Sequence, residues 1–104
     1  MIQLLVLLGM ICPVETDRQQ QPLPVLVLVV SEGCSACREV EPHAHLLARK
    51  GLLRVLDFER YPEWCRNQGI RAVPHLIVWQ QRGDRRLRAD FIGSERILEY
   101  ARRP

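Results

Sequence analysis

Apolar and polar positions follow one another along the chain in blocks that predict strands separated by helices. Residues 23–30, "LPVLVLVV", form a continuous apolar run rich in β-branched side chains, which indicates a strand buried on both faces. Residues 2–8 have a similar composition and predict an earlier strand, and residues 52–58, "LLRVLDF", predict a later one. Residues 75–80 and 86–92 flank the turn signal "QRGD" and predict a β-hairpin.

Helical patterns separate or follow these strands, over residues 35–50, 62–69 and 94–103. Pro42 lies inside the first helix and should kink it, and Ser94 is the expected N-cap of the last. Helices between strands imply parallel pairing, whereas the final hairpin is antiparallel. We therefore predict an α/β fold, with a mixed central β-sheet flanked by helices on both faces, in a single domain spanning 1–104.

Size and charge narrow the possible functions. With 104 residues, of which 47% are hydrophobic, the chain can bury a core without disulfide staples. Its four cysteines are therefore not required for stability, and some of them could be present for their chemistry. The net charge of +3 is too small to indicate nucleic-acid binding. The basic stretch "RGDRRLR", residues 82–88, is expected to be a solvated hairpin tip that could steer acidic partners.

The first twelve residues, "MIQLLVLLGMIC", are apolar but too few to span a bilayer, so no membrane span is expected. They could be the core of a signal peptide, but no basic side chain precedes them and no Ala-x-Ala-like site follows. A buried strand is the favoured interpretation. We therefore expect a cytoplasmic protein, with a periplasmic or exported one as the alternative if residues 1–12 act as a signal.

Cys34 and Cys37 form a CxxC motif between the strand 23–30 and the helix that follows it. A helix N-terminus offers free N–H groups and a positive dipole end, which stabilise a thiolate. A metal site is the alternative, because His43 and His45 lie a few residues further on. Two histidines at i and i+2 point to different faces of a helix, so no metal is expected.

The chain resembles the thioredoxin family along nearly all of its length. The CxxC follows the central strand, Pro42 lies five residues past Cys37, and Pro62 lies seven residues before Gly69. The segment "GIRAVPHLIVW" looks like the one that carries the family's cis-proline, here Pro74. Gly93, before the last helix, matches the glycine that borders the family's substrate groove.

The resemblance implies a thioredoxin-like fold and a thiol–disulfide oxidoreductase that acts on protein disulfides or dithiols. Cys34 would be the nucleophile and Cys37 the resolving thiol. Gly33, Val73, Pro74 and Gly93 would bind the substrate, the Val73 backbone pairing with an extended substrate chain. The resemblance implies no cofactor, a monomer, and a reductase or oxidase as the electron partner.

The chain departs from the family pattern close to the cysteines. The insert is Ser35-Ala36, and Gly33 replaces the usual tryptophan. Leu28 and Val55 stand where the family has a buried aspartate and its neighbouring lysine.

Three nearby residues could supply the missing pKa tuning: Glu32, Arg38 and His75. A protonated His75 near the sulfurs would stabilise the thiolate, which would make the protein a better oxidant or isomerase. Alternatively, His75 points into solvent or packs on the sheet.

Two rival functions stay open on the sequence. One is a periplasmic disulfide oxidase or isomerase. The other is a thioredoxin-fold binding module with an idle or metal-binding dithiol. The remaining thiols, Cys12 and Cys65, are expected to be small buried hydrophobes that do not pair with each other. Trp64 and Trp79 are expected to line the core or a groove.

Overall fold

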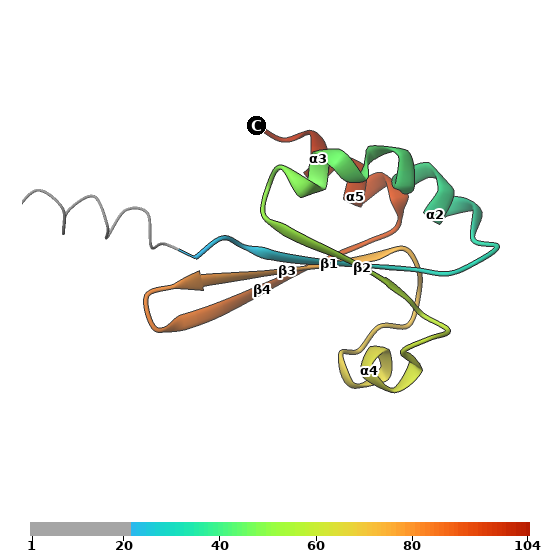
Figure 1. Cartoon of the computed structure of the whole chain (residues 1–104), viewed down its shortest axis with the longest axis horizontal. Coiled ribbons are helices and arrows are strands. Elements are labelled where there is room, and N and C mark those ends of the chain that lie inside the picture. Colours follow the sequence, from blue (N-terminus) through green and yellow to red (C-terminus); the bar gives the residue numbers. More distant parts are fainter. Residues whose placement is uncertain (1–21) are drawn as a thin grey trace, which may run out of the picture.

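Strand β1 (Val25–Val30) lies inside a four-stranded sheet with the order β2-β1-β3-β4 (Figure 1). The computed structural model describes residues 22–104, so the strand predicted over residues 2–8, and Cys12, lie outside the described residues. The four central residues of β1 are all buried, as expected for a strand covered on both faces.

The sheet is mixed, as predicted. Strand β2 (Leu52–Asp57) runs parallel to β1, and the hairpin of β3 (His75–Arg82) and β4 (Arg85–Ile92) is antiparallel. The expectation that helix-separated strands run parallel is wrong for β3, which is antiparallel to β1. The reason is that the connection through α4 (Pro62–Asn67) leaves β2 and enters β3 at the same end of β1.

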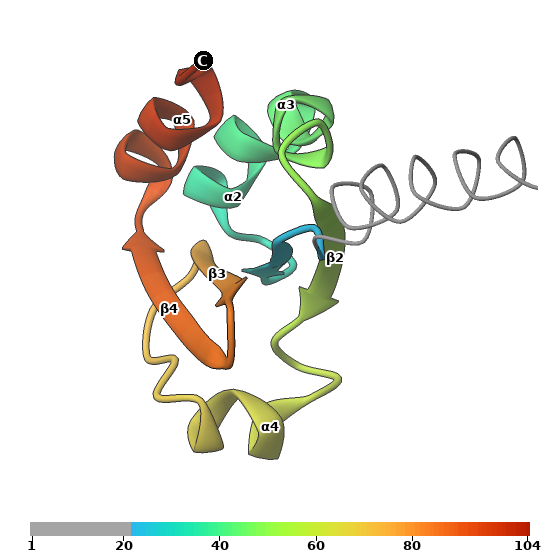
Figure 2. The same ribbon diagram turned by 90° about the vertical axis from the view of Figure 1, so that its left-hand side faces the viewer.

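Helices cover both faces of the sheet, which confirms the predicted α/β class. The helix predicted over residues 35–50 is broken into α2 (Ser35–Val40), a 3-10 turn, η1 (Glu41–His43), and α3 (Ala44–Ala48). The break lies at Pro42, which cannot donate a backbone hydrogen bond. These segments and α5 (Ser94–Arg102) lie on one face, and α4 lies on the other (Figure 2).

Two apolar clusters follow from this arrangement, one on each side of the sheet. The cluster under α2, α3 and α5 contains Leu26, Leu28, Val40, Leu47, Leu76, Val78, Ile97 and Ala101. The cluster under α4 contains Val27, Val29, Cys65, Ile70 and Ile77, with Trp64 and Trp79 packed against it. Alternate residues of β1 and β3 therefore point to opposite clusters, as the pleat of a strand requires.

The start of α5 differs from the prediction. Gly93, with φ of 93°, is the N-cap, and Ser94 is the first helical residue. The Ser94 hydroxyl donates instead to Oε1 of Glu39, at 3.2 Å, and so connects α5 to α2. A glycine is suited to this position because the positive φ is costly for other residues.

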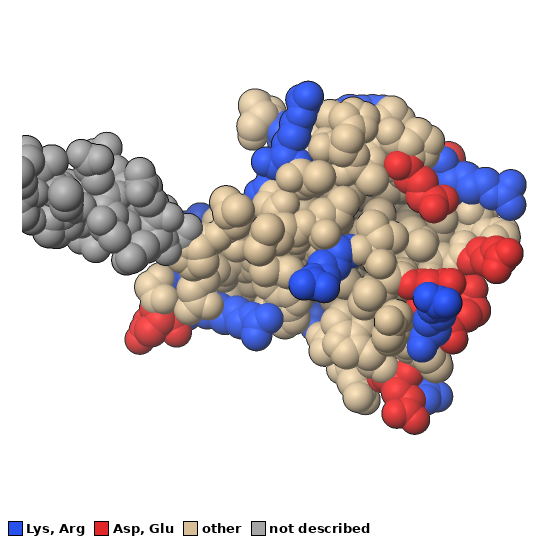
Figure 3. All heavy atoms as spheres, in the orientation of Figure 1, with Lys and Arg blue, Asp and Glu red and all other residues tan. Residues whose placement is uncertain are grey.

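The tip of the β3–β4 hairpin carries its basic side chains into solvent, as expected, whereas the Arg88 side chain, further from the turn, is only 28% exposed. Gly83, with φ of 63°, and Asp84 form the turn, and residues 81–90 are all exposed. Figure 3 shows arginine side chains, in blue, on the surface of this hairpin. No helix within residues 22–104 combines the length and the apolar composition needed to cross a membrane.

Gly51, between α3 and β2, generates a stability prediction. A Cβ atom added there would fall against the carbonyl oxygen of Pro24 and lie 2.9 Å from Cδ1 of Leu26. That carbonyl accepts the N–H of Leu52 at 2.8 Å, so it cannot move freely. We expect Gly51→Ala to lower the free energy of unfolding by about 1–3 kcal/mol, as for other overpacked sites.

Denaturant unfolding followed by circular dichroism measures this change. Arg49→Ala, at an exposed position two residues earlier, is the control and should stay within about 0.5 kcal/mol of the parent. A Gly51→Ala variant as stable as the Arg49→Ala control would contradict the predicted clash.

Candidate functional site

Cys34 and Cys37 stand where β1 passes into α2. The chain leaves β1 at Val30 and turns at Gly33, whose φ is 79°. Cys34 is then the N-cap of α2, half-buried, and Cys37 lies one turn later with 1% of its surface exposed. Their sulfurs are at disulfide distance, and their Cα atoms are 5.2 Å apart. This geometry permits a disulfide between the two cysteines.

The backbone at the start of α2 is directed at the Cys34 sulfur. The N–H of Cys37 donates to Sγ of Cys34 at 3.1 Å, so the sulfur takes the part that an oxygen plays in an ordinary N-cap. A hydrogen bond to the charged form of a group favours that form. When the disulfide is open, this N–H therefore stabilises a thiolate on Cys34.

A second segment, distant in sequence, meets the same sulfur. Sγ of Cys34 lies 3.8 Å from the carbonyl oxygen of Val73, and the Val73–Pro74 peptide bond is cis. The N–H of Gly93 donates to the carbonyl oxygen of Pro74 at 2.9 Å. The structure thus brings together four residues that the sequence analysis singled out, from the starts of α2, β3 and α5.

An open hollow of about 450 Å³ lies beside Cys34. Glu32 and Arg38, two of the expected tuning residues, line it and are exposed. Glu41 and Asp57 also line the hollow. They could not be predicted from the sequence, because they belong to different elements and no motif joins them. Figure 3 shows acidic side chains gathered at the end of the molecule that carries this loop.

The loop before Cys34 is held by a carboxylate of another loop. Glu59 accepts the Ser31 hydroxyl at 2.7 Å and the Glu32 N–H at 3.2 Å. The Ser31 hydroxyl is the main reason that the pKa of Glu59 lies below its usual range. No sequence pattern pointed to Glu59. Its carboxylate holds in place the loop that presents Cys34.

His75 lies away from the sulfurs. Its side chain is buried, and its Nε2 atom is 2.7 Å from Oδ2 of Asp90. It pairs with Val29 and shares the face of the sheet that α4 covers, opposite α2. Of the alternatives stated for His75, packing on the sheet is the one that the structure bears out. Its polar contact is a carboxylate, so the geometry gives no support to a His75 that stabilises the Cys34 thiolate.

Leu28 and Val55, the two residues at positions where the thioredoxin pattern has a charged pair, differ in their burial. Leu28 is fully buried in the cluster under α2, and Val55 is half-exposed on the edge strand β2. Cys65 is buried, as expected, and pairs with no other cysteine among residues 22–104, and burial raises the pKa of its thiol. The expectation that it does not pair with Cys12 lies outside the described residues. Within residues 22–104, no group of three or more His, Cys, Asp and Glu side chains is arranged to hold a metal ion.

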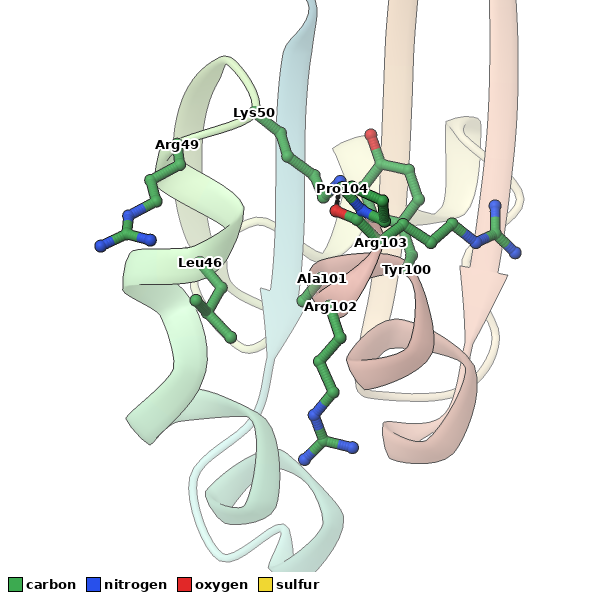
Figure 4. Close-up of a pocket in the computed structure, with 8 residues that line it drawn as sticks. All are labelled: Leu46, Arg49, Lys50, Tyr100, Ala101, Arg102, Arg103 and Pro104. Carbon is green, nitrogen blue, oxygen red and sulfur yellow. Dashed lines mark hydrogen bonds between the residues drawn. The ribbon is translucent and has the colours of Figure 1, made fainter.

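A larger hollow, of about 700 Å³, lies between α3 and α5, away from the cysteines. Lys50 lies there, donating to the carbonyl oxygen of Arg103 at 2.9 Å and stacking over the Tyr100 ring. Figure 4 shows the guanidinium groups of Arg49, Arg102 and Arg103 pointing in three different directions. Because these cations do not converge on one point, the hollow has no built site for an anion. Cations at the C-terminal ends of helices offset the helix dipoles.

Among known proteins, only solved structures are similar to this chain. No protein-family model matches the chain, and neither does any curated protein. Solved structures do. The germline-specific thioredoxin Deadhead of Drosophila melanogaster is 21% identical, with 83% of each chain covered and a TM-score of 0.62.

Two further solved structures are similar. Plasmodium falciparum thioredoxin is 13% identical, covering 85% of this chain and 75% of its own, with a TM-score of 0.67. Schistosoma mansoni thioredoxin pre-protein is 19% identical, covering 83% and 87%, with a TM-score of 0.60. Together with the CxxC at the start of α2, they establish that the chain has the thioredoxin fold.

Proposed function

We propose that this chain is a thiol–disulfide oxidoreductase that exchanges disulfides with protein substrates through Cys34 and Cys37. The observation that carries the proposal is the position of the Cys34 sulfur. It accepts the Cys37 N–H on one side and lies 3.8 Å from the Val73 carbonyl on the other. The sulfur is thus activated where a backbone edge is available to an extended substrate chain.

The reaction we propose has two exchanges. The Cys34 thiolate attacks one sulfur of a substrate disulfide, the substrate S–S bond breaks, and one substrate thiolate leaves and takes a proton. The Cys37 thiolate then attacks Cys34 in the mixed disulfide, releasing the second substrate thiolate, which also takes a proton. The substrate gains two electrons, and the CxxC pair loses them. The reverse sequence oxidises a substrate dithiol, and a reductase or oxidase restores the starting state.

Burial assigns the two roles. Cys34 is half-buried at the rim of the hollow and can be reached by a substrate sulfur, whereas Cys37 is 1% exposed and can be reached only by Cys34. Leu28 offers no proton acceptor on the buried side. Three carboxylates line the hollow and can take up a proton there, those of Glu32, Glu41 and Asp57.

Trapping experiments test the two roles. We expect Cys37→Ser to accumulate a mixed disulfide with a disulfide-containing protein such as insulin, because the resolving step is lost. Cys34→Ser should form none. Cys65→Ala is the matched control, and it should turn over without accumulating an adduct, because Cys65 is buried under α4. Non-reducing gels and mass spectrometry measure the adducts. Trapping by Cys34→Ser alone would reverse the assigned roles.

Thiol reactivity tests the arrangement without a protein substrate. In the reduced native protein, iodoacetamide should modify Cys34 at least about tenfold faster than Cys65, because thiolate content and exposure both favour Cys34. Burial leaves Cys65 inaccessible and raises the pKa of its thiol. Peptide mass spectrometry gives the rates, and unfolding in urea should make the two thiols similar. Equal rates in the native protein would contradict this account.

The redox potential of the Cys34–Cys37 pair tests the direction of electron flow. Equilibration against glutathione buffers, with alkylation as the readout, should give one reversible two-electron transition. A value near roughly −270 mV would support a reductase and the cytoplasmic placement that we propose. A value toward about −120 mV would favour an oxidase or isomerase in an oxidising compartment. Failure to form a reversible disulfide would reject the enzyme and leave a binding module.

A further inference from the structure

The segment Gly69–Pro74 joins α4 to β3 and carries Val73, whose carbonyl faces Cys34. Arg71 and Ala72, in its middle, are exposed. The segment is therefore held mainly at its two ends. Ile70 and Pro74 are buried, the Ile70 N–H donates to the Cys65 carbonyl at 2.9 Å, and further polar contacts lie just beyond the segment. Those polar contacts converge on two alternate residues of the edge strand β4, which lie on the same face of the strand.

The first end is held by Arg88. Gln68 is the C-cap of α4, the last residue before the segment. The Arg88 guanidinium donates to the Gln68 backbone carbonyl at 2.7 Å and to its side-chain Oε1 at 3.1 Å. Because the planar guanidinium binds both the main-chain and the side-chain oxygen of Gln68, it fixes the direction in which the chain leaves α4.

The second end is held by Asp90. His75, the first residue of β3, approaches Oδ2 of Asp90 at 2.7 Å. The other ring nitrogen, Nδ1, is buried without a partner among the described residues. A bare nitrogen lone pair is tolerated there more readily than a bare N–H, so the proton is placed on Nε2, which donates to Asp90. The His75 ring is thereby fixed next to Pro74.

Arg88 and Asp90 are themselves joined, which links the two ends. Nε and Nη2 of Arg88 donate to the two carboxylate oxygens of Asp90, each at 2.9 Å. Arg88 is the main reason that the pKa of Asp90 lies below its usual range, with His75 adding to the effect. Arg88 also lies 5.2 Å from the Trp79 ring centroid, which supports the guanidinium from the strand side.

An ordinary surface ion pair contributes little, but this one has features that such pairs lack. It is bidentate, both side chains are about two-thirds buried, and it continues into a backbone carbonyl and a buried ring. Register explains the grouping, because Trp79 pairs with Arg88 and Ile77 with Asp90, so alternate residues of both strands share the face under α4.

We propose that Arg88 and Asp90 are positioning residues that clamp both ends of the segment Gly69–Pro74 and so hold the Val73 carbonyl in place for protein substrates. This inference rests on the proposed function but adds a specificity role on the far face of the sheet. The clamp acts on the backbone that receives an extended substrate chain. It does not touch either sulfur, so small disulfides should not need it.

Hydrogen exchange tests the clamp without any catalytic assay. The Gly93 N–H is protected by its bond to the Pro74 carbonyl, so it reports whether the end of the segment stays in place. In Asp90→Ala, exchange at Gly93 should be about tenfold faster, in line with the loss of a charged hydrogen-bond network. The amides of Val27 and Val29 should keep their protection, which shows that the variant is folded. Unchanged exchange at Gly93 would overturn the clamp.

Kinetics test what the clamp does. Asp90→Ala should raise KM for insulin reduction by about tenfold, and Arg88→Lys should raise it by less. In both variants kcat should stay within about twofold of the parent. Arg88→Lys keeps the charge but loses the fork. Equilibration of the Cys34–Cys37 pair with glutathione should be unchanged in both. Arg86→Ala is the matched control, because Arg86 stacks on Trp79 at 4.2 Å from the same strand and has no hydrogen bond to the segment.

The outcomes separate the clamp from the proposed function. If the parent protein does not reduce insulin, the proposed protein-disulfide activity fails, and hydrogen exchange still decides whether the clamp exists. If the parent is active and the variants lose kcat or shift the glutathione equilibrium at unchanged KM, the positioning role is wrong. If Arg86→Ala raises KM as much as Asp90→Ala does, general loss of charge on β4 explains the effect and the clamp is rejected.

Discussion

The burial of β1 on both faces and both edges is the constraint on which the site depends. Leu26 and Leu28 point into the cluster under α2, α3 and α5, whereas Val27 and Val29 point into the cluster under α4. Each fully buried side chain of this kind contributes about 1.5–3 kcal/mol, and both edges of the strand are hydrogen-bonded. A strand held in this way leaves no freedom at its end. Cys34, reached after a short turn, therefore has a fixed position relative to the start of β3.

The sheet separates two tasks that a disulfide-exchange site has to combine. On the α2 side, the Cys37 N–H donates to the Cys34 sulfur, and the hollow leaves that sulfur open to a reaction partner in the function that we propose. On the α4 side, Arg88 and Asp90 hold the chain that presents Val73. Because the two sets of contacts lie on opposite faces, a change in one need not disturb the other. A chain that has Leu28 where thioredoxins carry a buried acid can thus keep intact the backbone that we propose for substrate binding.

Most of the fold could be predicted from the sequence, because it depends on local signals. The run 23–30, the helix break at Pro42 and the hairpin around Gly83 each follow from a few adjacent residues. The errors concern long-range geometry. The direction of β3 depends on where the α4 connection returns to the sheet. Ser94 is not the N-cap of α5, because its hydroxyl donates to Glu39 on another helix. Likewise, no motif joins Glu59 to the loop before Cys34, since they meet only once β2 lies beside β1.

The arginines of β4 show why composition alone could not identify the clamp. In sequence they form one basic stretch, and a solvated hairpin tip is the simplest expectation for it. In space, neighbours of the same type have different roles. Arg86 stacks on Trp79, whereas Arg88 reaches across to Asp90 and Gln68. Charges along an edge strand also discourage pairing with another chain, so the same residues can protect the open edge of β4. Both side chains lie on the same face of β4, and the difference between them is their position along the strand: Arg88 lies opposite Trp79, whereas Arg86 lies opposite Gln81, nearer the turn. That position is fixed only by the register with β3.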